Sequence, residues 1–420
     1  MKPQAPFPHG TSIRSFLLTF AWIPVAGLLV FILPWHLPVR GPVDSQSYVF
    51  GFHNAAALVG LAGILAFLAW QRASSAEKRG QDQRLFSDLF LTRPQHPTKG
   101  LYLTVGCALL SFLTIFAWWM YLPYGFFGES AYFLTRLDMV TMGFLPFRDF
   151  DFGYGPVMLW LPWALSRFSA GFLPIDTSYI LTVGPFFFLG IFALHFVTRR
   201  IRLPGPWQTI VLLFGALSFF NLTLGIQYTP IRFLYPMMAA FLCHEQARQG
   251  WARGFVASFF LPLGGLMLGP EVGLVTILAI LAGLLGYWQS NRAKTLACFS
   301  APLVALGVTR LIFGPDYFDI IRSFGGGAYN FPIFPAPYIL SLLGLSLWIL
   351  PRIFSSSLGR GESGPLCLSL LVCMGLFLPA ALGRCDPGHV LLNGSGIFLI
   401  SIAASLRESR RVALPLACLS

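Results

Sequence analysis

Long apolar segments separated by short polar stretches make up most of the chain. Each segment is low in charge and about 16 to 24 residues long, which suits an α-helix that crosses the hydrocarbon core of a bilayer. The pattern predicts an all-α, polytopic transmembrane helical bundle of about twelve spans. They are expected at residues 16–39, 48–70, 101–122, 178–198, 207–222, 232–247, 254–270, 272–290, 295–313, 336–354, 364–382 and 390–406.

Two stretches depart from this pattern of spans. Segment 156–170 is apolar but short, and it is predicted as a juxtamembrane helix that lies in the membrane interface. Residues 71–100 are polar and mixed in charge, without a motif, and are expected to form a solvated cytoplasmic loop. This loop divides the chain into residues 1–100, with two leading spans, and a transmembrane module at 101–420. The apolar residues after Arg411 resemble the start of a further span, so we expect more protein beyond Ser420.

The composition supports a membrane protein. Of the 420 residues, 56% are hydrophobic and 10% are charged, a balance that would leave a soluble domain with one continuous apolar surface. The seven Cys form no CxxC pair, and most of them lie inside apolar segments, as small buried hydrophobic residues do.

The net charge of +12 reflects topology rather than nucleic-acid binding. Most of the 28 Lys and Arg residues lie in segments that are inner when the N-terminus is cytoplasmic, whereas most acidic residues lie in outer segments. We therefore expect a multi-pass protein of the plasma membrane (bacterial inner membrane), in contact with membrane lipids and without a nucleic-acid partner.

The predicted outer loop at 123–156 is the strongest candidate site. It carries four carboxylates in a chain that has few, and carboxylates beside a bilayer are costly unless they have a function. They are Glu129, Asp138, Asp149 and Asp151.

Other unusual polar groups fall on the same predicted face. They are Arg148, Tyr154, Arg232, Glu271, Arg322, Arg384, Asp386 and His389. Each has a structural alternative: Arg384 and Asp386 can pair at a helix end, and Glu271 can simply favour the first turn of a helix. Their convergence on one face favours a polar pocket at the outer membrane boundary.

These residue types suit group transfer from a lipid phosphate. A carboxylate can accept the proton of a hydroxyl as its oxygen attacks. Arginine matches the bidentate geometry of phosphate oxygens, and a cleft between spans could hold a lipid tail. A second carboxylate could steer the acceptor or hold a divalent cation, so the metal requirement stays open.

The loop also resembles that of the GT-C type integral membrane glycosyltransferases. Such loops show an acidic residue, a helical stretch, a G-x-x-P-Y-R-D element and an aromatic–Pro turn. The matching positions are Glu129, then Gly143, Pro146, Phe147, Arg148 and Asp149, then Tyr154, Gly155 and Pro156, with Phe147 in place of the frequent Tyr. The segments around Glu271 and around Arg384, Asp386 and His389 are also similar to outer-face elements of bacterial members.

The resemblance implies an enzyme, an inverting transferase of hexosyl or pentosyl groups. Its lipid-linked sugar donor would be a polyprenyl phosphate, and a glycan, lipid or protein hydroxyl would be the acceptor on the extracytoplasmic face. Glu129 or Asp149 is expected as the catalytic base, with Asp138 as a further candidate and Asp151 nearby. Arg232, Arg384 and Arg322 would bind the donor phosphate beside His389, and Tyr154 would stack on a sugar. Arg148, Glu271 and Asp386 complete the expected substrate-binding residues.

Two other functions fit the pattern. A transporter or flippase for a lipid-linked or charged solute would also carry ionisable groups in its spans, although here they cluster at one face and no repeated half is evident. A non-catalytic assembly partner would turn Glu129 and Asp149 away from any cleft.

Overall fold

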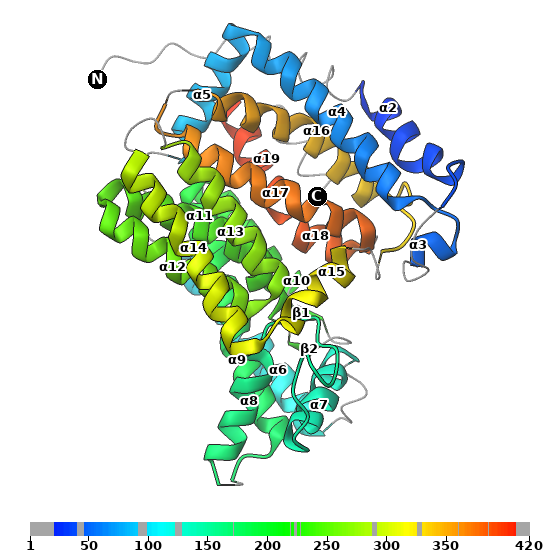
Figure 1. Cartoon of the computed structure of the whole chain (residues 1–420), viewed down its shortest axis with the longest axis vertical. Coiled ribbons are helices and arrows are strands. Elements are labelled where there is room, and N and C mark those ends of the chain that lie inside the picture. The colour runs from blue at the N-terminus through cyan, green and yellow to red at the C-terminus, as the bar shows by residue number, and fades with distance from the viewer. Residues whose placement is uncertain are drawn as a thin grey trace. The chain divides into compact units, whose positions relative to one another are not determined.

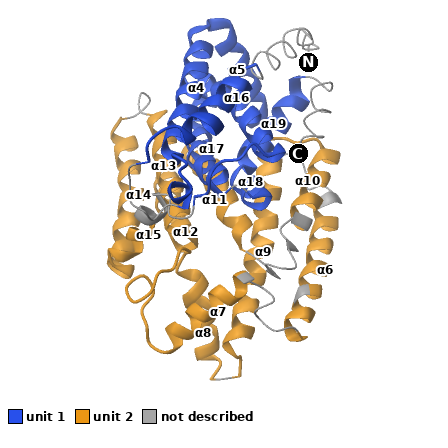
Figure 2. Cartoon of the chain, turned by 90° about the vertical axis from the view of Figure 1, so that its right-hand side faces the viewer, with its two compact units in different colours: residues 1–93, 323–420 blue, residues 94–322 orange. Residues whose placement is uncertain are grey.

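The computed structural model shows a helical protein with a pair of very short strands (Figure 1). It describes residues 21–39, 46–90, 99–121, 128–170, 172–218, 220–221, 225–226, 228–287, 292–325, 330–359, 361–384 and 386–408. The chain divides into two compact units: unit 1 combines residues 1–93 with 323–420, and unit 2 is formed by 94–322 (Figure 2). The sequence division at residue 100 falls close to the first boundary, but the return of the C-terminal segment to the N-terminal one is a property of the fold.

Unit 1 is built around helix α16 (Pro337–Ser357), which is mostly apolar and largely buried. Helices α4 (Asn54–Ser74), α5 (Ala76–Phe90), α17 (Gly364–Arg384) and α19 (Ser395–Glu408) pack against it. The remaining elements are α2 (Ile23–Gly27), η1 (Leu28–Ile32), η2 (Leu33–Trp35), α3 (Gln46–Val49) and α18 (Pro387–Asn393).

Unit 2 has helix α11 (Thr229–Gln249) at its centre, packed against α9 (Ile175–Arg200), α12 (Trp251–Leu268) and α13 (Pro270–Leu285). Its other elements are α6 (Lys99–Tyr121), α7 (Gly128–Thr141), α8 (Val157–Phe168), α10 (Gly205–Ser218), α14 (Arg292–Phe313) and the start of α15 (Asp316–Gly325). Two-residue strands β1 (Phe220–Asn221) and β2 (Gly225–Ile226) pair antiparallel, with Phe220 opposite Ile226.

Seven helices in the described part of the chain are long and apolar enough to cross a membrane: α4, α6, α9, α12, α14, α16 and α17. The pair α18 and α19, bent by 65°, makes an eighth if it forms one span. The protein is therefore membrane-embedded. The count of twelve is not confirmed, because the other predicted spans, where the structure describes them, coincide with shorter or more polar helices. Helix α13 has 16 residues, and the 21 residues of α11 include Arg232, His244 and Glu245.

The predicted interfacial helix at 156–170 forms α8, which has 12 residues and contains Pro162. Met158, Leu159 and Pro162 are buried, whereas Leu161, Leu165 and Phe168 are exposed. The helix is confirmed, and its position in the membrane interface stays a prediction.

The polar loop expected at 71–100 contains a packed helix instead. Leu85, Phe86, Leu89 and Phe90 of α5 are buried, and so is the side chain of Asp82. The turn between α4 and α5 is closed by the Lys78 backbone N–H, which donates to the Ser75 hydroxyl at 3.4 Å. The four apolar residues recur at helical spacing, and they dock α5 on α16 and α19.

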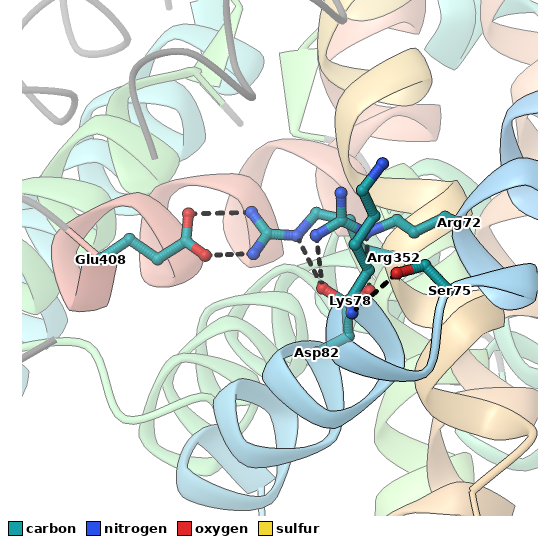
Figure 3. Close-up of polar contacts among 6 residues, drawn as sticks. All are labelled: Arg72, Ser75, Lys78, Asp82, Arg352 and Glu408. Atoms are coloured by element: carbon teal, nitrogen blue, oxygen red, sulfur yellow. Dashed lines mark hydrogen bonds and ion pairs between the residues drawn. The ribbon is translucent and has the colours of Figure 1, made fainter. Parts of the chain in front are cut away.

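A buried network of four charged side chains ties the helices of unit 1 together (Figure 3). Asp82 accepts hydrogen bonds from Arg72 of α4, at 2.6 and 2.8 Å, and from Nε of Arg352 on α16, at 3.1 Å. The guanidinium of Arg352 also donates to both carboxylate oxygens of Glu408 on α19. Two positive charges therefore balance two negative ones, which is the condition under which buried ions are tolerated.

Candidate functional site

Four of the predicted site residues are connected side chain to side chain in unit 2. Glu129 at the start of α7 bonds to Tyr154, the ring of Tyr154 lies beside Arg232 of α11, and Arg232 pairs with Glu271 of α13. We call this set the Arg232 cluster. It joins residues from three helices and one loop, and it alternates negative, neutral, positive and negative groups.

Glu129 is held by the loop that follows α7. The Tyr154 hydroxyl donates to Glu129 Oε1 at 2.7 Å. Burial, followed by the charge of Glu129, raises the pKa of Tyr154 well above its ordinary value, although Arg232 acts in the opposite direction. Tyr154 therefore remains a hydrogen-bond donor at physiological pH, and it fixes the orientation of a half-buried carboxylate.

A close backbone contact positions Tyr154. The N–H of Gly155 donates to the carbonyl oxygen of Leu268, at the end of α12, at 3.1 Å. A Cβ on residue 155 would lie 2.1 Å from the carbonyl oxygen of Met267, so only glycine allows this approach. The aromatic–Pro turn thereby lies directly against the segment that leads to Glu271.

Arg232 is enclosed in the first turns of α11, with a side chain that is 10% exposed. Its guanidinium carbon lies 4.5 Å from the ring centroid of Tyr154, and 5.5 Å from those of Tyr228 and Phe233. A terminal nitrogen donates to Glu271, whereas the buried Nε has no hydrogen-bond partner within the described chain. The guanidinium thus retains donor capacity inside an aromatic enclosure.

The aromatic enclosure extends beyond the residues that the sequence singled out. The ring of Phe133 lies 4.8 Å from that of Tyr154 and 6.0 Å from that of Tyr228, and all three are largely buried. Phe133 is one helical turn after Glu129, and Tyr228 is one turn before Arg232, so helical spacing from each candidate was the signal available for them.

Asp149 and Arg148 have a different role, because they build the turn before Tyr154. Asp149 accepts from the Leu145 N–H at 2.8 Å and from Arg148 Nε at 2.9 Å. The Arg148 hydrogen bond, followed by that of Leu145, lowers the pKa of Asp149, and Asp149 in turn raises the pKa of Arg148. The pair closes a turn in which Phe147 has a φ of 71°. A carboxylate engaged in this way is a weak base.

The other two loop carboxylates face outward. Asp138 lies on α7 and Asp151 follows the turn, and both are exposed. Neither side chain forms a hydrogen bond or ion pair with another residue in the described ranges. The structure therefore separates the four acidic residues of the loop into one half-buried group that Tyr154 orients, one turn-forming group and two exposed groups.

An apolar groove adjoins the Arg232 cluster. Its volume is about 560 Å³, and it is lined by one face of α8 with Pro156, Trp160, Leu161 and Ala164, and by Met267 and Phe313 on neighbouring helices. The groove and the cluster share two short stretches of chain, because Pro156 follows Gly155 and Met267 precedes the turn to Glu271. An apolar chain in the groove would thus lie beside the stretches of chain that carry Tyr154 and lead to Glu271.

Three predicted residues belong to unit 1. Asp386 caps α18: it accepts the His389 N–H at 2.9 Å and lies 2.6 Å from His389 Nδ1. Burial raises the pKa of Asp386, but the two hydrogen bonds from His389 and the charge of Arg384 lower it more, so the net pKa is below its ordinary value. Arg384 ends α17 and is half-buried. The side chain of Arg322 lies outside the described part of the structure.

A metal centre has little support in the described ranges, which contain no group of three or more His, Cys, Asp or Glu side chains arranged to hold an ion. The divalent cation remains a prediction from the sequence.

Comparison with known proteins gives no independent guide. No family model matches the sequence, and neither a curated protein nor a solved structure matches it. The Arg232 cluster and the groove are therefore the features of the molecule that bear on its function.

Proposed function

We propose that the protein is an integral membrane glycosyltransferase that moves a sugar from a polyprenyl-phosphate donor to an acceptor hydroxyl on the extracytoplasmic face. The observation that carries this proposal is the connected set Glu129, Tyr154, Arg232 and Glu271 beside an apolar groove. It combines a candidate base, a cation for an anionic headgroup and a surface for a lipid chain.

Glu129 is the best candidate for the general base. It is oriented by the Tyr154 hydroxyl and forms no ion pair with a described residue, so its carboxylate retains the ability to accept a proton from an acceptor hydroxyl. Attack by that hydroxyl on the anomeric carbon, with departure of the lipid phosphate, would invert the configuration. Asp149 is less suitable because its two oxygens are already occupied by Arg148 and Leu145.

Arg232 is the best candidate for binding the donor phosphate. It has donor capacity left over, and burial among aromatic rings strengthens its attraction for an anion. The groove beside α8 offers the apolar surface that a polyprenyl chain needs. Tyr154 remains a candidate for contact with the sugar, as does Arg148 at the edge of the loop.

The proposed topology has twelve spans in the bacterial inner membrane, with a cytoplasmic N-terminus. The helices α11 and α13 support spans beyond the seven apolar ones, because α11 covers the predicted span 232–247 and α13 covers most of the predicted span 272–290. Reporter fusions test the orientation: a reporter at Ser75 is expected in the cytoplasm and one at Ser169 outside it. The reverse result would contradict the proposal that the candidate site faces the extracytoplasmic side.

The function is tested with purified protein in detergent, labelled polyprenyl-phosphate sugars and a panel of glycan, lipid and peptide acceptors. Transfer or slow donor hydrolysis is expected, and Glu129→Gln should reduce it by at least about 100-fold, the usual contribution of a general base. Asp151→Asn is the matched control, since Asp151 is an exposed carboxylate of the same loop. Equal activity of the two variants would contradict the assignment of Glu129.

The transporter hypothesis makes a different prediction in the same preparation. After reconstitution into vesicles, a flippase would move the labelled lipid between leaflets without breaking its phosphate–sugar bond. Movement of the labelled lipid without sugar transfer or hydrolysis would contradict the proposed enzyme and support the flippase.

A further inference from the structure

Arg232 already holds an anionic group: the carboxylate of Glu271. The guanidinium is enclosed by aromatic rings, its side chain is only 10% exposed, and its Nε has no partner within the described residues. An anion that reached Arg232 would meet Glu271 at the same guanidinium. The Glu271 carboxylate and an incoming anion therefore compete for the guanidinium of Arg232.

Leaving Arg232 unpaired is costly, because a buried guanidinium without a counter-ion loses its hydration without compensation. Glu271 is the only carboxylate that forms an ion pair with Arg232 in the described chain. Simple departure of Glu271 is thus unfavourable, whereas exchange of Glu271 for another anion keeps the charge balanced. The environment of Arg232 thus favours the replacement of one anion by another over a state in which Arg232 has no anion.

Glu271 has an alternative environment when it leaves. Its side chain is 32% exposed, so water reaches it. It also lies in the first turn of α13, where the helix dipole favours a negative charge. Moving the Glu271 carboxylate into water therefore costs less free energy than leaving Arg232 without a counter-ion. In this ion pair Arg232 stays in place, and Glu271 is the partner that can be replaced.

We infer that Glu271 is a resident substitute for the phosphate of the lipid-linked substrate, and that a phosphate monoester or diester binds Arg232 by displacing the Glu271 carboxylate. This inference rests on the proposed function for the identity of the anion, and it adds the regulation of the same site. In the resting protein Glu271 lowers the affinity for phosphate. Bound phosphate in turn releases a carboxylate into the site.

Binding of farnesyl phosphate to the purified full chain in detergent tests the exchange, by calorimetry and by the ligand-induced shift in melting temperature. Glu271→Gln should tighten binding by about tenfold or more, because an uncompensated Arg232 gains its counter-ion from the ligand. The matched control is Glu245→Gln, which removes the carboxylate of another arginine pair in the same unit, Arg200–Glu245 at 2.5 Å. Its affinity should equal that of the wild type.

A second variant displaces Glu271 without removing a charge. A Cβ on residue 269 would lie 3.0 to 3.3 Å from the carboxylate atoms of Glu271, and the extended backbone of Gly269 accepts alanine. Gly269→Ala should therefore push the carboxylate aside and tighten farnesyl phosphate binding in the same direction as Glu271→Gln. It also serves if Glu271→Gln fails to fold.

The ligand arms separate the sources of the anion. The affinity for farnesol, which carries no phosphate, should be the same in Glu271→Gln as in the wild type. The affinity for inorganic phosphate should change in the same direction as that for farnesyl phosphate if the anion alone is recognised. Unchanged or weaker farnesyl phosphate binding in both variants overturns the inference. Tighter farnesyl phosphate binding by the variants, with no transfer activity in the wild type or in either variant, would contradict the glycosyltransferase proposal. It would still support the exchange of Glu271 for phosphate.

Discussion

Asp82 and Arg352 are 270 residues apart in the chain, and their side chains meet inside unit 1, where Arg352 Nε donates to Asp82 Oδ1 at 3.1 Å. Both side chains are at least 95% buried. The contact connects α5, which the sequence indicated as a solvated loop, with the central helix α16. Charged residues thus help to define the core of a protein that is otherwise held together by apolar helix packing.

Removal of one carboxylate from this network should be strongly destabilising. Asp82→Asn leaves Arg72 and Arg352 with a single carboxylate, and breaking a buried ion pair typically costs about 3–5 kcal/mol. Unfolding in detergent, followed by circular dichroism, measures the loss. Glu77→Gln on the exposed face of the same helix is the control and should change stability by less than about 0.5 kcal/mol. Similar stability of the two variants would contradict the buried network.

The turn formed by Arg148 and Asp149 should persist into mildly acidic conditions. Because the pKa of Asp149 is lowered in the folded turn, its contribution to stability is fully present above the unfolded value of about 3.9 and is lost as the pH falls through the lower folded value. Hydrogen exchange at Leu145, corrected for intrinsic rates, should therefore stay slow at pH values above the unfolded pKa. Asp149→Asn should accelerate it at neutral pH, and Asp151→Asn should not. Opening of the wild-type turn at a pH above the ordinary pKa of aspartate would contradict a lowered pKa of Asp149.

Gly155 should not tolerate a side chain. In Gly155→Ala the methyl group would overlap the backbone of Met267 and Leu268, so the loop must leave α12, and both the melting temperature and any activity should fall. Gly106→Ala is the matched control, because a Cβ at that exposed helical position meets no atom within 4 Å. Equal behaviour of the two variants would show that the loop does not lie against α12.

Tyr154 has two separable contacts, one through its hydroxyl and one through its ring. Tyr154→Phe keeps the ring beside Arg232 and removes the hydrogen bond to Glu129, so kcat should fall by about tenfold while KM for the donor stays constant. Tyr154→Leu also removes the ring and should raise the donor KM. A change of donor KM in Tyr154→Phe alone would place the hydroxyl, rather than the ring, in donor binding.

The pattern of apolar residues predicted the positions of the helices better than the tertiary contacts that their side chains make. Segments 336–354 and 364–382 were predicted as spans and form α16 and α17, because uniform hydrophobicity over this length leaves few alternatives to a buried helix. Helix α5 was missed because its charged residues dominate the local composition. Asp82 looks like an exposed loop residue until Arg72, Arg352 and Glu408 surround it, and those partners depend on tertiary packing.

The candidate site shows the same division. The sequence placed Glu129, Tyr154, Arg232 and Glu271 on one predicted face, and the structure connects all four within unit 2. Which acid pairs with which cation was not predictable, because the Arg232–Glu271 pair depends on the packing of α11 against α13. The separation of Asp149 from Glu129 likewise depends on a turn in which Phe147 adopts a positive φ.

The division of unit 1 into residues 1–93 and 323–420 has a consequence for biosynthesis. The ribosome completes all of unit 2 before it makes Arg352 and Glu408, so α4 and α5 must wait for their partners. During that interval Arg72 is the sole member of the network available to Asp82, and their bidentate pair neutralises the charge in advance. Unit 1 can close only after Arg352 and Glu408 have been synthesised, which makes nascent chains that stop before Arg352 the expected clients of membrane chaperones and proteases.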